Sequence, residues 1–180
     1  MFNLNPQVRI APLELEHAAK MSEWMADPQV ASNVGLRRKA SAENTVQWIQ
    51  KALQDSAIRA FAILLAHNHV GNVVLDQIDG YLNSARLSVY IGEADFRGQG
   101  IGSTAVYLAA KEGFEKEGLN KVWLTVHLMN HAAIAAYAKL GFVLEGILRD
   151  EFWLDGERIA VLRMSLLRRE FASLECYSSR

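Results

Sequence analysis

Hydrophobic and polar positions recur with two different periods along the chain, and the change of period separates the predicted elements. Apolar residues at helical spacing predict helices near 14–25, 41–55, 102–118 and 131–140. Alternating or continuous apolar runs predict strands near 8–13, 58–66, 70–78, 85–91, 121–128, 142–148 and 158–167. This order predicts an α/β (α+β) protein with a mixed, mostly antiparallel sheet of about seven strands flanked by about four helices.

Local signals support these boundaries and indicate one domain. Ser41 offers an N-cap to the second helix, Gly141 follows the last one, and Asp155-Gly156 marks a turn between the final strands. No repeat, low-complexity tract or linker divides the chain. We therefore expect a single domain over residues 1–180, with its core at about 8–167.

Composition and charge exclude several classes of protein. The 180 residues are 51% hydrophobic and carry 19 Lys and Arg against 20 Asp and Glu, which argues against a nucleic-acid partner. The longest apolar run, Ala60 to Ala66, is too short to cross a membrane, which takes about 18 residues or more. The five His and the single Cys176 have no metal-ligand spacing, so we expect no metal, no internal disulfide and a cytoplasmic protein.

The segment 97–102, Arg-Gly-Gln-Gly-Ile-Gly, follows a predicted strand and opens a long helix. Glycines let successive backbone N–H groups turn toward one point, and the helix start adds about half a positive charge. A pyrophosphate fits such a loop. The spacing differs from that of a dinucleotide-binding or Walker loop, and a helix entry that binds nothing is the alternative.

This loop resembles that of the GCN5-related N-acetyltransferases (GNAT family), whose pattern is Gln/Arg-x-x-Gly-x-Gly/Ala. Arg97, Gly100 and Gly102 occupy its defined positions. The resemblance implies that acetyl-CoA is the co-substrate and that the loop backbone holds its pyrophosphate. The residues implied are Phe96, Arg97, Gly98, Gln99, Gly100, Ile101 and Gly102.

A second segment, 130–142, is similar to the family's Asn-x-x-Ala helix with its Tyr and terminal Gly-Phe. Asn130 and Tyr137 lie seven residues apart, almost two helical turns, and so point to the same side. The resemblance implies that Asn130 binds the pantetheine arm and that Tyr137 protonates the departing thiolate as general acid. A Tyr137 that only packs against the sheet is the alternative.

The resemblance spans about residues 8–167 and is closest to one branch of the family. That branch contains ribosomal-protein N-terminal acetyltransferases, spermidine acetyltransferases and sugar-nucleotide acetyltransferases. It implies that the strands ending near Glu93 and Met129 splay apart to admit the acyl arm. A backbone N–H between Tyr90 and Gly92, at Ile91, would hold the thioester oxygen. A homodimer is compatible with the resemblance.

The general base is not assigned by the motifs. Many relatives carry a carboxylate in the strand before the loop, but here that stretch reads Leu-Ser-Val-Tyr at 87–90. Glu93 at the strand end and His127 on the neighbouring strand are the candidates, each acting through water. The pKa of a free imidazole, about 6.5, suits His127, whereas a structural His and a solvated Glu are the alternatives.

Two charged segments give opposite indications about the acceptor, which is a small-molecule or peptide amine. Arg37 and Arg38 precede a lysine and would suit a phosphate-bearing or acidic acceptor, whereas residues 150–157 are acidic and would suit a cationic amine. We rank a protein N-terminal α-amine first, an amino-sugar nucleotide second and a polyamine third. A non-catalytic acyl-CoA-binding sensor is the alternative from another class.

Overall fold

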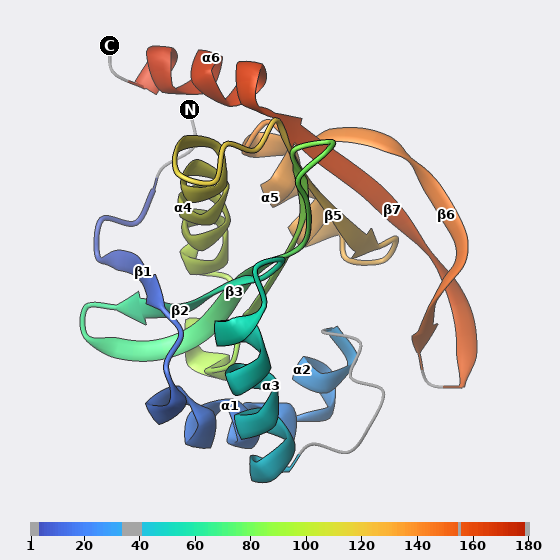
Figure 1. The fold of residues 1–180 in the computed structure, drawn as a ribbon. Coiled ribbons are helices and arrows are strands. Elements are labelled where there is room, and N and C mark those ends of the chain that lie inside the picture. The colour runs from blue at the N-terminus through green and yellow to red at the C-terminus, as the bar shows by residue number, and fades with distance from the viewer. Residues whose placement is uncertain (1–3, 34–40, 155, 179–180) are drawn as a thin grey trace.

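The computed structural model describes residues 4–33, 41–154 and 156–178. Its described part contains a seven-stranded sheet in the order β1-β2-β3-β4-β5-β7-β6 (Figure 1). All neighbouring strands are antiparallel except β4 and β5, which are parallel. The strands are β1 (Val8–Pro12), β2 (Arg59–Leu65), β3 (Asn68–Asp79), β4 (Ser84–Ile91), β5 (Lys121–His127), β6 (Val143–Leu154) and β7 (Glu157–Leu167). The predicted class and strand number are confirmed.

Helices cover both faces of the sheet. Because side chains alternate along a strand, neighbours on β2 enter different cores. Ala62 packs with α1 and α3, whereas Phe61 and Ile63 join the core that contains α4. The helices are α1 (Ala18–Met25), α2 (Pro28–Asn33), α3 (Ala42–Gln54), α4 (Ile101–Glu115), α5 (His131–Lys139) and α6 (Arg168–Ser178), with 3-10 turns η1 (Leu15–His17) and η2 (Ala94–Phe96).

Helix α4 lies against the centre of the sheet, and small side chains allow the close approach. Ala105, Ala109 and Ala110 are fully buried. A Cβ on Gly113 would lie 2.9 Å from Leu119 Cδ1 and 3.1 Å from a methyl group of Leu75. This packing holds the N-terminal end of α4 beside the last residues of β4, where the glycine loop lies.

The predicted cap of α3 is confirmed, since the backbone N–H of Asn44 donates to Ser41 Oγ over 3.1 Å. Helices α2 and α6 were not predicted. Phe171 anchors α6, because its ring is buried against Tyr107 and Phe114, 5.1 and 5.2 Å away between centroids. Such distant contacts leave no periodic signal in a short polar segment.

The region after 148 also differs from the prediction. It was expected to be an acidic loop, but β6 continues through it to Leu154. The register shifts between Leu148 and Phe152, and Asp150 adopts a positive φ of 53°. A bulge therefore absorbs the polar residues without ending the strand, and the hairpin of β6 and β7 extends away from the helices (Figure 1).

Candidate active site

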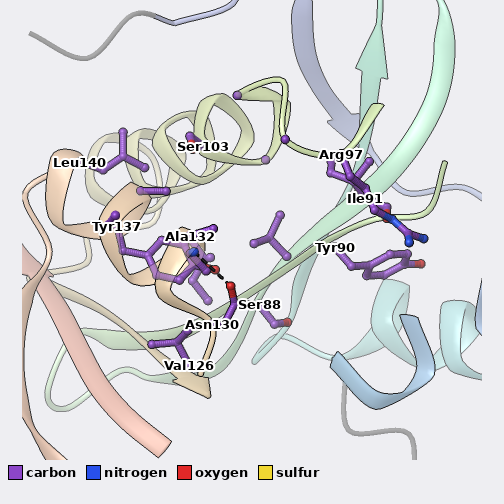
Figure 2. Close-up of a pocket in the computed structure, with 18 of the residues that line it drawn as sticks. Ser88, Tyr90, Ile91, Arg97, Ser103, Val126, Asn130, Ala132, Tyr137 and Leu140 are labelled. Carbon is purple, nitrogen blue, oxygen red and sulfur yellow. Dashed lines mark hydrogen bonds between the residues drawn. The ribbon is translucent and has the colours of Figure 1, made fainter. Parts of the chain in front are cut away.

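The parallel strands β4 and β5 separate and open a cavity in the sheet. They pair at only three positions, where Ser84–Arg86 lie beside Lys121–Trp123. Beyond these positions β4 continues to Ile91 and β5 to His127 without pairing to each other. A cavity of about 1130 Å³ occupies this wedge, lined by β4, the glycine loop, β5 and α5 (Figure 2). The predicted splaying is thus present, and it leaves main-chain groups free to bind a ligand.

The hydrogen-bond pattern of β4 determines which of its main-chain groups face the wedge. The N–H of Gly92 donates to the carbonyl of Val70 on β3 over 2.9 Å. Bonding direction alternates along an antiparallel strand, so Tyr90 also bonds toward β3 and the N–H of Ile91 points toward β5. Between Tyr90 and Gly92, Ile91 is therefore the residue whose N–H can face an acyl group.

The glycine loop presents uncapped N–H groups to the cavity. Gly98 and Gly100 both have φ of 75°, a left-handed conformation that glycine adopts without strain. Gly100 is the N-cap of α4 and has no side chain to accept from the first-turn amides, which have no intrahelical partner. A Cβ on Gly102 would meet only Ile91 Cγ1, at 3.8 Å. The loop thus fits a pyrophosphate, as the sequence predicts.

The side chain of Arg97 is directed to other partners than a phosphate. Its Nε donates to the carbonyl of Ile91 over 3.1 Å, and one terminal nitrogen donates to the carbonyl of Gly92 over 2.9 Å and to Asp27 Oδ2 over 3.0 Å. The guanidinium thereby joins the loop to β4 and to the turn between α1 and α2. The group of Arg97 that can contact a cofactor is therefore its main-chain N–H, as expected for the loop backbone.

Two other loop residues also use their side chains within the protein. Gln99 Nε2 donates to the carbonyl of Asp95 over 2.6 Å. Ile101, the first residue of α4, is buried in the main hydrophobic core. Both can contribute to cofactor binding through backbone amides alone. Phe96, in contrast, lines the cavity with Gly98, Gly100 and Gly102.

Asn130 and Tyr137 line the same cavity, as the helical spacing predicts (Figure 2). Asn130 caps α5, since its Oδ1 accepts from the N–H of Ala133 over 3.1 Å. Its amide NH2 group is left to donate to a ligand. Tyr137 packs on Phe142, and burial raises the pKa of its phenol to about 12. The phenol therefore stays protonated at neutral pH and can donate to a developing thiolate.

The structure separates the two candidate bases. His127 lines the cavity and packs edge-on against Phe152, with ring centroids 4.4 Å apart. Burial lowers the pKa of His127, so its imidazole is neutral at pH 7 and can accept a proton. Glu93 forms an ion pair with Lys20 over 3.0 Å, which lowers the pKa of its carboxyl, and it is not among the residues that line the cavity.

Arg37 and Arg38 lie outside the described residues. In the described part of the chain, no group of three or more His, Cys, Asp and Glu side chains could hold a metal ion. None of the helices described there is long and apolar enough to span a membrane.

Several lining residues were missed by sequence reasoning. Ser103 and Lys139 line the cavity from α4 and α5. Ser88, Thr125 and Phe152 lie on the separated strands and on β6. Strand alternation could assign Ser88 and Thr125 to a face, but only the separation of β4 from β5 turns that face into a site.

Comparison with known proteins agrees with this geometry. Residues 7–143 match the family model described as an acetyltransferase (GNAT) domain. Spermidine N(1)-acetyltransferase of Escherichia coli (strain K12) is 31% identical over 174 residues, covering 91% of this chain and 88% of the relative. The corresponding enzyme of Vibrio cholerae is 29% identical over 152 residues, covering 84% of this chain and 82% of the relative.

Solved structures give the same result. The spermidine N-acetyltransferase of Vibrio cholerae in complex with CoA and spermine has a TM-score of 0.87 and 27% identity, covering 93% of this chain and 99% of that one. A dodecameric structure of the Vibrio cholerae enzyme has a TM-score of 0.79 and 26% identity, over 93% and 97% of the two chains. The chain therefore belongs to the GNAT acetyltransferase family and is an N-acetyltransferase whose acetyl donor is acetyl-CoA.

Proposed function

We propose that the acceptor is an aliphatic primary amine of the polyamine class. The observation that carries this proposal is the similarity, over more than four fifths of the chain, to spermidine acetyltransferases, one of which was solved with CoA and spermine. The cavity adds support, because Tyr90, His127 and Phe152 line it with aromatic rings. Such rings suit the ammonium groups and methylene segments of a polyamine. For these reasons we rank a polyamine ahead of the protein α-amine, which we ranked first from the sequence.

The reaction assigned to these residues is direct transfer. The amine nitrogen attacks the acyl carbon while the N–H of Ile91 stabilises the charge on the thioester oxygen. The C–S bond breaks, and the phenol of Tyr137 donates to the thiolate that leaves. The proton released by the amine passes to the neutral imidazole of His127. The products are the N-acetylated amine and CoA with a free thiol.

The acceptor must lose a proton before it can attack, and the free energy of this deprotonation depends on the pKa of the amine. A lysine-like amine with a pKa near 10.4 costs about 4.6 kcal/mol to deprotonate at pH 7, whereas an α-amine near 7.8 costs about 1. Because its pKa is lowered, His127 is too weak a base to deprotonate a lysine-like ammonium group efficiently. A polyamine therefore enters as its minor neutral form, and kcat/KM rises tenfold per pH unit between pH 7 and about 9.

One observation favours a second candidate, the protein N-terminal α-amine. Of the described residues that line the cavity, the charged ones are Arg86, Arg97 and Lys139, and none carries a carboxylate. An acceptor with one weakly basic amine requires neither a strong base nor an anionic pocket. With this acceptor kcat/KM levels off near pH 8.

A panel assay decides between the acceptors. Release of free CoA thiol is measured with spermidine, spermine, peptides with free N-termini and amino-sugar nucleotides. Turnover of the two polyamines at least tenfold above the other classes supports the proposal. Turnover of peptides or sugar nucleotides with no turnover of polyamines contradicts it, and the pH profile of the best substrate gives an independent result.

We also propose that the chain forms a homo-oligomer through β6. A dodecameric structure is known for the Vibrio cholerae relative, and β6 is an edge strand in the described sheet. Leu144, Ile147 and Trp153 of this strand are more than half exposed. Light scattering tests the proposal: Ile147→Asp is expected to lower the measured mass, whereas a monomeric wild-type chain contradicts it.

A further inference from the structure

Two hydroxyl groups lie on opposite sides of the wedge, on the acceptor face of the sheet. Ser88 is two residues beyond the last paired position of β4, and Thr125 is two residues beyond the last paired position of β5. Because strand side chains alternate, Ser88 shares a face with Arg86, and Thr125 shares it with Trp123 and His127. Both residues line the cavity.

Neither hydroxyl is used by the fold. Both side chains are exposed in the cavity, and no described residue forms a hydrogen bond with either of them. Thr104 is different, since its hydroxyl accepts from the N–H of Asn5 over 3.0 Å and donates to the carbonyl of Gly100 over 3.1 Å. Ser165 likewise donates to Glu145 over 2.8 Å. The hydroxyls of Ser88 and Thr125 are therefore available to a ligand.

The surrounding residues show which ligand meets these hydroxyls. The opposite face of the same strand segments carries Val89, Ile91, Leu124 and Val126, all apolar, and it is the face on which α4 packs. The glycine loop opens α4 on that side, so the donor enters there. The hydroxyls lie on the other face, where the acceptor must approach the acyl carbon.

We propose that Ser88 and Thr125 form a clamp that positions the primary amine of the acceptor. This inference rests on the proposed function. Each hydroxyl oxygen accepts one N–H of the neutral amine, which aims the remaining lone pair at the acyl carbon beside Ile91. A primary amine offers two N–H groups and satisfies both oxygens, whereas a secondary amine offers one. The clamp therefore selects primary over secondary amines.

The clamp also gives the leaving proton a path. As the C–N bond forms and the C–S bond breaks, the nitrogen loses one proton to the Thr125 hydroxyl, which passes its own proton to His127. His127 lies two residues further along β5 on the same face. Each hydroxyl ends the step unchanged, and the thiolate leaves with a hydrogen bond donated by the phenol of Tyr137, which keeps its proton. Ser88 and Thr125 are thus positioning groups that touch the substrate.

The test measures acceptor kinetics for Ser88→Ala, Thr125→Val, the double variant and the conservative Thr125→Ser. We expect each single loss to lower kcat/KM for the amine by about 2- to 12-fold, the effect of one net hydrogen bond. The dissociation constant for acetyl-CoA remains unchanged, and Thr125→Ser retains activity. Ser56→Ala, in an exposed turn, serves as the matched control.

A second readout separates positioning from a structural role. The best primary amine and its N-methyl derivative are compared at equal concentrations of the neutral form. The wild-type chain is expected to prefer the primary amine, and the double variant to lose most of that preference. An unchanged preference in the double variant overturns the clamp. Absence of turnover with every amine by the wild-type chain instead overturns the proposed function, and the clamp with it.

Discussion

Replacing Tyr137 by Phe removes one hydroxyl from the cavity and preserves the packing of the ring on Phe142, 5.9 Å away between centroids. Because no described residue forms a hydrogen bond with that hydroxyl, the substitution leaves no partner unsatisfied within the part of the chain described. We therefore expect the fold and the binding of acetyl-CoA to be preserved. The loss should fall on turnover.

The size of the loss follows from the pKa of the phenol. Burial raises that pKa to about 12, whereas a thiol titrates near 8.5, so complete proton transfer to the thiolate is uphill by about 4.8 kcal/mol. Tyr137 accordingly acts by donating a strong hydrogen bond to the developing thiolate. A hydrogen bond to a charged group contributes about 1.5–3 kcal/mol, which corresponds to a fall in kcat of about 10- to 150-fold.

The assay measures kcat by thiol release at saturating acetyl-CoA, and the dissociation constant of acetyl-CoA by calorimetry. Tyr81→Phe is the matched control, because Tyr81 is 93% exposed and lies in the turn between β3 and β4. The raised pKa of Tyr137 also predicts that the phenol causes no loss of kcat between pH 7 and 10, since it remains protonated throughout.

Three results would refute this reasoning. An unchanged kcat in Tyr137→Phe shows that the hydroxyl takes no part in thiolate departure. A large rise in the dissociation constant of acetyl-CoA with kcat preserved shows instead that Tyr137 has a packing role. A basic limb in the wild-type pH profile that disappears in the variant contradicts the assigned pKa.

Three further predictions concern the loop and the base. Gly102→Trp should raise the acetyl-CoA dissociation constant at least about tenfold, since each hydrogen bond to a charged group contributes about 1.5–3 kcal/mol; Gly102→Ala should bind normally, because its Cβ meets only Ile91 Cγ1 at 3.8 Å. Arg97→Ala should lower the melting temperature by about 2–8 °C, measured calorimetrically, through the loss of about 1–2 kcal/mol of partly exposed contacts; an unchanged value would show that they contribute nothing. Because burial lowers the pKa of His127, protonation of its imidazole should add to the loss of neutral amine only below pH 6.5, so kcat/KM should fall more steeply there, and His127→Gln should abolish this added steepness. An equally steep fall in His127→Gln would assign it to another group.

The sequence by itself determined the features that depend on neighbouring residues. The loop at 97–102 could be predicted from its glycines, because glycine favours the left-handed backbone conformation that Gly98 and Gly100 adopt and that other residues rarely adopt. The common side of Asn130 and Tyr137 follows from the helical repeat alone. The cap at Ser41 and the strand periodicity are equally local, and so the seven strands were predicted in their correct order, together with the helices α1, α3, α4 and α5.

Only the tertiary structure decided which groups meet at the site. Arg97 binds Asp27, 70 residues away, and Glu93 binds Lys20, so two charged residues that the sequence offered to the ligands are used inside the protein. Ser88 and Thr125 line one cavity because β4 and β5 stop pairing after three positions and open a wedge between them. Local propensity specifies the conformation of a segment, but contacts between distant segments depend on how the whole sheet and its helices pack, and no residue pattern within one segment encodes that packing.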